Sequence, residues 1–147
     1  MGGYVAAPIN MVNDYGNFYY RAKTDFVTKE PIEKGWSGDK KYCALTADGT
    51  KYLLRITPES MSARCADIFR LQQTVSELGV PMCRPIEIGE CDGGVYTVQT
   101  WVDGDDAENV IISLSNNEQY SYGLEAGRIL KIIHSVPAPT DHPDWES

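Results

Sequence analysis

Residues 41–45 and 51–56 are two predicted strands joined by a tight turn. Both runs are rich in strand-forming side chains, and Asp48-Gly49 lies between them. Asp-Gly is favoured in tight hairpin turns because such turns need positive φ angles. A third strand is predicted at residues 26–33, immediately before the first run. The chain is therefore expected to contain a meander of three antiparallel strands.

A helix and a second hairpin follow the meander. Apolar residues recur at helical spacing from Met61 to Leu78, and Thr57-Pro58 resembles an N-cap with proline at the first helical position. We therefore expect a helix over residues 60–78, ended by Gly79. Residues 85–89 and 95–102 then predict two more strands.

Two helices complete the predicted order of elements. A short one is expected over residues 107–114. The sequence Ser115-Asn-Asn-Glu118 is a capping box, which predicts a longer helix running to about residue 135. The order predicts an α+β fold with a five-stranded antiparallel sheet and one packed helix. We expect an N-terminal arm (1–26), the sheet domain (27–104), a helical extension (105–139) and a linker-like tail (140–147).

Composition excludes several classes of protein. The net charge of −8 argues against a nucleic-acid partner, since phosphate binding needs a basic face. Four cysteines without a C-x-x-C pair and only two histidines argue against a zinc site, and the thiols are expected to be unpaired. No apolar run approaches the roughly 20 residues that span a bilayer. The N-terminus lacks the features of a signal peptide, so the chain is expected to be cytoplasmic with no membrane partner.

One segment carries candidate chemistry. Gly35, Ser37 and Gly38 lie in a loop between the predicted strands 26–33 and 41–45, and Arg55 lies in the predicted strand 51–56. Backbone N–H groups in such a loop can face phosphates, and a strand cation can neutralise them. The alternatives are a plain hairpin connection for the glycines and a salt bridge for Arg55.

Three segments in this order resemble the aminoglycoside phosphotransferase and choline kinase family. They are Lys34-Gly-Trp-Ser-Gly-Asp-Lys-Lys-Tyr42, Thr100-Trp-Val-Asp-Gly104, and Leu130-x-x-x-His134-Ser135 followed by prolines. The resemblance covers residues 26–147. It implies the N-terminal lobe of the protein-kinase-like fold, with ATP and Mg²⁺ as cofactors.

The resemblance also implies roles for individual residues. Ser37 and Gly38 match the loop over the β- and γ-phosphates, and Arg55 matches the strand cation that contacts the α- and β-phosphates. Arginine stays charged and can bind phosphate bidentately, so it keeps the role that lysine usually has there. The adenine-binding hinge corresponds to Gln99, Thr100, Trp101 and Val102. Gln99 takes the gatekeeper position, and the Thr100 carbonyl and Val102 N–H supply the hydrogen-bonding groups.

The sequence also departs from the family pattern. The helix after Arg55 should carry a glutamate that pairs with the cation, but the nearest acid, Asp67, is about one position away. Arg55 is therefore expected to lack its usual partner. The catalytic aspartate, the metal-binding asparagine and the later metal-binding aspartate have no counterpart in residues 1–147. They belong to the C-terminal lobe, which we expect to be missing, so no catalytic or metal-binding residue is assigned.

Two functions of different classes stay open at this stage. The first is the nucleotide-binding lobe of a small-molecule kinase, catalytically incomplete as given. The second is a non-catalytic module of kinase-lobe type that self-associates or binds a protein. In either case the lobe is expected to expose apolar surface on the Tyr120–Leu124–Leu130 helix. A homodimer would cover that surface, or the aromatic arm Tyr15 to Tyr20 would fold back over it and leave a monomer.

Overall fold

The structure is a computed structural model that describes residues 23–91 and 93–140. Part of the arm predicted at residues 1–26, and all but the first residue of the tail predicted at 140–147, lie outside the described residues. The chain divides into two compact units. One contains the sheet and the first part of helix α1 (Cys65–Glu77); the other contains residues 74–81 and the chain from Asp103 onward.

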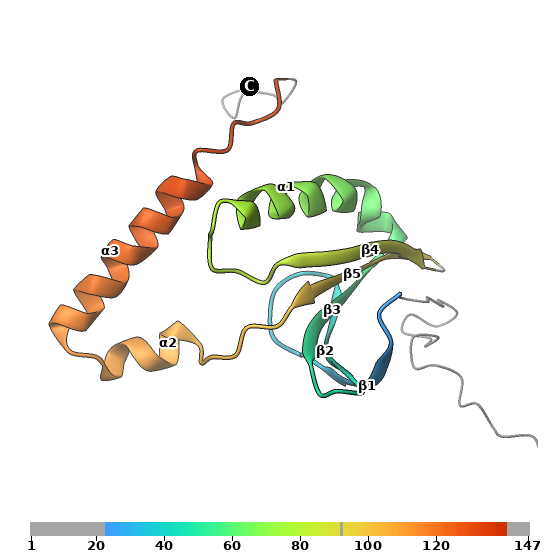
Figure 1. The fold of residues 1–147 in the computed structure, drawn as a ribbon, viewed down its shortest axis with the longest axis horizontal. Helices are drawn as coiled ribbons and strands as arrows, with labels where there is room; N and C mark the ends of the chain where they lie inside the picture. Colours follow the sequence, from blue (N-terminus) through green and yellow to red (C-terminus); the bar gives the residue numbers. More distant parts are fainter. Residues whose placement is uncertain (1–22, 92, 141–147) are drawn as a thin grey trace, which may run out of the picture. The chain divides into compact units, whose positions relative to one another are not determined.

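The sheet has five antiparallel strands, as the sequence predicts. They are β1 (Phe26–Pro31), β2 (Lys40–Thr46), β3 (Lys51–Pro58), β4 (Pro85–Cys91) and β5 (Gly94–Thr100). Their order across the sheet is β1-β2-β3-β5-β4, so β3 pairs with β5 and the last hairpin forms one edge (Figure 1). The predicted turn at Asp48-Gly49 joins β2 to β3, with Gly49 at a φ of 85°.

The two faces of the sheet have different roles. One face holds the buried core, made of Phe26, Ala44, Leu54, Ile56, Tyr96 and Val98. The opposite face carries the alternate residues of the same strands. On it Arg55 lies between Lys41 of β2 and Thr97 of β5, and Leu53 lies between Cys43 and Gln99. Because side chains alternate along a strand, the predicted cation and the predicted gatekeeper share this second face.

The helix after β3 begins later than the sequence predicts. Pro58 is the last residue of β3, with a ψ of 153°, and a 3₁₀ helix, η1 (Glu59–Arg64), follows it. The α-helix α1 (Cys65–Glu77) starts only at Cys65. The prediction of Thr57 as N-cap and Pro58 as first helical residue is wrong, because pairing of Pro58 with Gly94 keeps this segment in the sheet.

A buried glutamate joins the two edges of the sheet. Glu87 of β4 accepts hydrogen bonds from the backbone N–H groups of Lys23 and Thr24, at 2.6 and 3.1 Å, just before β1. It also accepts from the Thr24 hydroxyl at 2.9 Å and the Tyr96 hydroxyl at 2.6 Å. The Tyr96 ring reaches Glu87 across Gly89, where a Cβ atom would lie 2.5 Å from the ring. The sheet is therefore curled around its core, and its edges are tied together.

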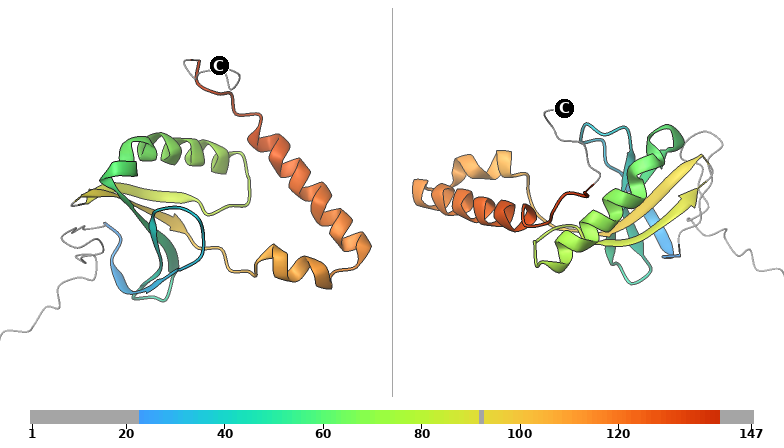
Figure 2. Two further views of the ribbon diagram at one scale, coloured as in Figure 1. Left: turned by 180° about the vertical axis from the view of Figure 1, so that it is seen from behind. Right: turned by 90° about the horizontal axis from the view of Figure 1, so that it is seen from above.

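The second unit contains the C-terminal helices, coloured orange to red in Figure 2. The predicted short helix is α2 (Ala107–Val110) continued by a 3₁₀ turn, η2 (Ile111–Ser113). Helix α3 (Asn116–Ile133) begins at the predicted capping box, in which Ser115 and Glu118 bond each other's backbone N–H groups. Tyr120, Tyr122, Leu124 and Leu130 of α3 are exposed. In the described residues, no helix is both long and apolar enough to cross a bilayer.

Candidate functional site

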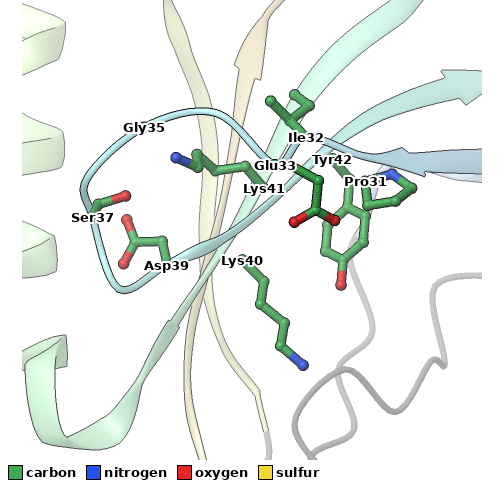
Figure 3. A pocket seen from close by; sticks show the side chains of 9 residues that line it. All are labelled: Pro31, Ile32, Glu33, Gly35, Ser37, Asp39, Lys40, Lys41 and Tyr42. Atoms are coloured by element: carbon green, nitrogen blue, oxygen red, sulfur yellow. The ribbon is translucent and has the colours of Figure 1, made fainter.

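The loop between β1 and β2 encloses one side of the candidate site. Residues 32–39 curve away from the sheet and return to it at Lys40, bordering a hollow of about 360 Å³ (Figure 3). Gly35 has a φ of 106°, a conformation that residues with a side chain rarely adopt. Trp36, the next residue, is fully exposed. The predicted phosphate loop is thus a curled and largely solvent-exposed segment.

A lysine that the sequence did not single out fills the interior of this loop. Lys41 of β2 points into the bend in Figure 3, whereas Lys40 points away. The Lys41 ammonium donates a hydrogen bond to the Lys34 carbonyl at 2.5 Å. A Cβ atom on Gly35 would lie 2.4 Å from that ammonium. The glycine therefore admits the cation, and the cation holds the loop in its curled form.

Arg55 forms an ion pair with Asp39 at the end of the same loop. Its Nε lies 3.1 Å from Asp39 Oδ2, and its Nη2 contacts the same oxygen. The Asp39 side chain is only 8% exposed and that of Arg55 is 30% exposed. Arg55 is thus half-buried, as its apolar neighbours in the sequence predict. The expectation that it would lack an acidic partner is wrong, because the loop supplies a carboxylate in place of the helix.

A second hollow, of about 210 Å³, lies between the sheet and the first part of α1. Arg55, Thr97 and Gln99 line it from the sheet, and Ser37 and Asp39 line it from the loop. The remaining lining residues come from the end of β3, η1 and α1: Thr57, Met61, Cys65, Ile68, Phe69 and Gln72. Gln99 is buried and donates a hydrogen bond to Gln72 at 2.9 Å. This amide pair links the gatekeeper position to the helix.

The predicted hinge leaves the sheet at Thr100. The Thr100 N–H donates to the Arg84 carbonyl at 2.9 Å, and its hydroxyl accepts from the Arg84 N–H at 2.7 Å. Trp101 and Val102 lie beyond β5, and Val102 is 58% exposed. Two contacts to Arg84 thus fix the point where the hinge begins.

The predicted site residues fall into two groups. Ser37, Arg55 and Gln99 line the second hollow. Gly38 lies beside it, where a Cβ atom would be 2.9 Å from the sulfur of Met61. The hinge residues Thr100, Trp101 and Val102 do not line either hollow among the described residues.

Sequence reasoning missed Asp39, Lys41 and Gln72 as parts of the site. The position of Lys41 follows once the strand register is known, because Lys41 pairs with Arg55 and therefore shares its face of the sheet. Asp39 could not be predicted because its partner lies on another strand, and no local pattern predicts that pairing. Gln72 was not predicted because the family pattern places an acidic residue, and not an amide, on this helix.

The charge of the site differs from that of the whole chain. Four cations, Lys34, Lys40, Lys41 and Arg55, lie in or beside the loop, against the carboxylates of Glu33 and Asp39. The chain as a whole carries a net charge of −8. The strand cations Lys40, Lys41 and Arg55 thus make the surroundings of the loop positive, which suits an anion, and curled backbone in such loops presents N–H groups to it.

The sequence of residues 28–147 matches the model of the phosphotransferase enzyme family. The chain belongs to that family. No curated protein matches the chain well enough to be named as a relative. The five-stranded antiparallel sheet with one packed helix is consistent with the kinase-like N-terminal lobe that the resemblance implies.

Proposed function

We propose that this phosphotransferase chain binds the triphosphate of ATP between the loop of residues 32–39 and Arg55. The observation that carries the proposal is the common face of the sheet, on which Arg55 and Gln99 lie beside the loop of residues 32–39. Arg55 would contact the α- and β-phosphates, and Ser37 and Gly38 would lie over the β- and γ-phosphates. This is the arrangement that kinase-like enzymes use to neutralise phosphate charge.

The base of the nucleotide would lie farther along the same face. Leu53 and Cys43 are paired neighbours there and present an apolar surface beside Gln99. The adenine would rest against them, with the Thr100 carbonyl and the Val102 N–H as its hydrogen-bonding groups. The second hollow, about 210 Å³, is below the roughly 300–1,000 Å³ of small-molecule sites, so binding by this chain alone should be weak.

The residues present do not fit a magnesium site. Asp39 is the one carboxylate lining the second hollow in the described part of the chain, and it is engaged by Arg55. In nucleotide sites Mg²⁺ is usually held by one or two carboxylates together with substrate phosphates, and this hollow offers no carboxylate beyond the one paired with Arg55, so no step is assigned to a metal held by these residues. We propose that the 147 residues bind nucleotide but do not complete phosphoryl transfer.

Titration calorimetry with ATP and Mg²⁺ at millimolar concentrations tests the binding. We expect a Kd of roughly 1 mM for the wild type and no measurable heat for Arg55→Ala. Arg70→Ala is the matched control, because Arg70 is an exposed cation of α1 that pairs with Asp67. Equal binding by the Arg55→Ala variant would remove the proposed site.

A transfer assay tests the second part of the proposal. Aminoglycosides, macrolides, choline and homoserine serve as acceptors for the γ-phosphate of labelled ATP. We expect background rates with every acceptor, because positioned metal ions and a base are what make this reaction fast. Robust turnover by the purified 147-residue chain would contradict the proposal.

A further inference from the structure

Arg55 cannot take its acidic partner from helix α1. The acid nearest to the expected position, Asp67, is 73% exposed and pairs with Arg70 one turn along the helix. The α1 residues that line the hollow beside Arg55 are Cys65, Ile68, Phe69 and Gln72, and Gln72 bonds Gln99. The face of α1 that would usually supply a positioning carboxylate therefore presents apolar and amide side chains to Arg55 in this chain.

Asp39 takes that place from the opposite direction. It is the residue before β2, and Lys40, which follows it, pairs with Ile56, the neighbour of Arg55. The register thus delivers the carboxylate to the guanidinium. A carboxylate that is 8% exposed has lost most of its water, and this loss is costly unless a cation compensates for it. Asp39 and Arg55 therefore hold each other in place.

The contact uses only one edge of the guanidinium. Nε and Nη2 both donate to Asp39 Oδ2, which leaves the edge formed by Nη1 and the second Nη2 hydrogen. Arginine has five N–H donors in a rigid fork, so one edge can bind a carboxylate while the other binds phosphate. Lysine, with a single ammonium, has no such division.

We propose that Asp39 is the positioning residue for Arg55, a role that a helix glutamate has in related kinase-like folds. The proposal rests on the nucleotide-binding function proposed above. Asp39 ends the phosphate loop, so the orientation of the strand cation depends on the conformation of that loop. Closing of the loop over a phosphate and alignment of Arg55 then become one event.

Asp39 could also act in the opposite sense, by competing with phosphate for Arg55, and this role predicts the opposite effect on ATP affinity. If Asp39 instead acted as an internal substitute for phosphate, its charge would compete with the nucleotide. Removing that charge would then strengthen binding. The Asp39→Asn variant separates the two roles, since asparagine keeps the size of the side chain and removes its charge.

The test is calorimetric titration of ATP into Asp39→Asn, with adenosine as the second ligand. We expect about a tenfold loss of ATP affinity and no change for adenosine, which has no phosphate. Glu90→Gln is the matched control, because Glu90 is an exposed carboxylate of β4 that lines neither hollow of the candidate site. Unchanged or tighter ATP binding by Asp39→Asn would overturn the positioning role and leave the proposed function intact.

A second readout needs no nucleotide. In ¹⁵N-resolved NMR spectra, the Nε–H of Arg55 should exchange slowly with water in the wild type and in Glu90→Gln. In Asp39→Asn it should exchange at least tenfold faster, because its acceptor has lost its charge. An unchanged exchange rate would overturn the inference even if the wild type binds no ATP. Absent ATP binding by the wild type would instead overturn the proposed function.

Discussion

Replacement of Glu87 by glutamine should destabilise the sheet by about 3 kcal/mol, and the geometry explains why. Each carboxylate oxygen of Glu87 accepts one hydrogen bond from a backbone N–H and one from a hydroxyl. Oε1 accepts from the Lys23 N–H and the Tyr96 hydroxyl, and Oε2 accepts from the N–H and the hydroxyl of Thr24. The hydroxyls can rotate to accept a bond from the new amide, but a backbone N–H can only donate. Whichever way the amide is turned, one N–H group faces an NH₂ group.

The magnitude follows from that mismatch. An unsatisfied buried donor costs about 1–3 kcal/mol, and the remaining bonds lose the extra strength of a charged acceptor, about 1 kcal/mol in total. For a urea m-value of about 2 kcal/mol/M, the midpoint of unfolding should fall by about 1.5 M. The matched control is Glu90→Gln on the same strand, an exposed carboxylate whose loss should change stability by less than about 0.5 kcal/mol.

The pH dependence of this difference provides a second check. Burial alone would raise the pKa of Glu87, but the hydrogen bonds from Tyr96, Lys23 and Thr24 outweigh it and hold the pKa below its usual value. A lowered pKa gives stability that is present above about pH 4.5 and is lost as the pH falls through the folded-state value. The difference in the free energy of unfolding between the wild type and Glu87→Gln should therefore be largest at neutral pH and should decrease as the pH falls below about 4.5. Equal urea midpoints at pH 7 would refute the reasoning.

Three further predictions concern other parts of the chain. Gly89→Ala should destabilise the sheet in urea by about 1–3 kcal/mol, because its Cβ would lie 2.5 Å from the Tyr96 ring; Gly123→Ala, with open space around it, should not. Ser115→Ala should lower the helicity measured by circular dichroism, because Ser115 caps α3; Ser121→Ala, within the helix, should have a smaller effect. With Trp101 and Trp145 replaced by phenylalanine, Lys41→Ala should lower the fluorescence anisotropy of Trp36, because the Lys41 bond to the Lys34 carbonyl braces the loop, whereas Lys40→Ala should leave it unchanged.

The order of elements could be predicted from the sequence because its signals are local. Asp48-Gly49, Gly79 and the Ser115 capping box each fix a turn or a helix end through a few neighbouring residues. The start of the helix after β3 could not be predicted in this way. Proline at position 58 fits both a first helical turn and a strand end, and only its pairing with Gly94 decides between them.

Residues of the candidate site could be predicted from the sequence only where the evidence for them lies within one short segment of the chain. Arg55 follows from its place within a strand, and Gln99 follows from the family resemblance. The partner of Arg55 does not, since Asp39 reaches it through the register of β2 against β3, sixteen residues away in the chain. Likewise, Glu87 has no sequence signal that would join it to Thr24, because that contact depends on the curvature of the whole sheet.

The pairing of β3 with β5 has a consequence for the order of folding events. All other neighbouring strands in the sheet are joined by hairpins, whereas β3 and β5 are separated by α1 and β4. Closing a loop of roughly 35 residues costs about 3 kcal/mol of chain entropy, which must be lost before the contacts form. The meander and the last hairpin should therefore form early, and their docking should limit the rate. Substitutions at the Leu54–Val98 pair should slow refolding, whereas Glu87→Gln, at the closure of the edges, should mainly speed unfolding.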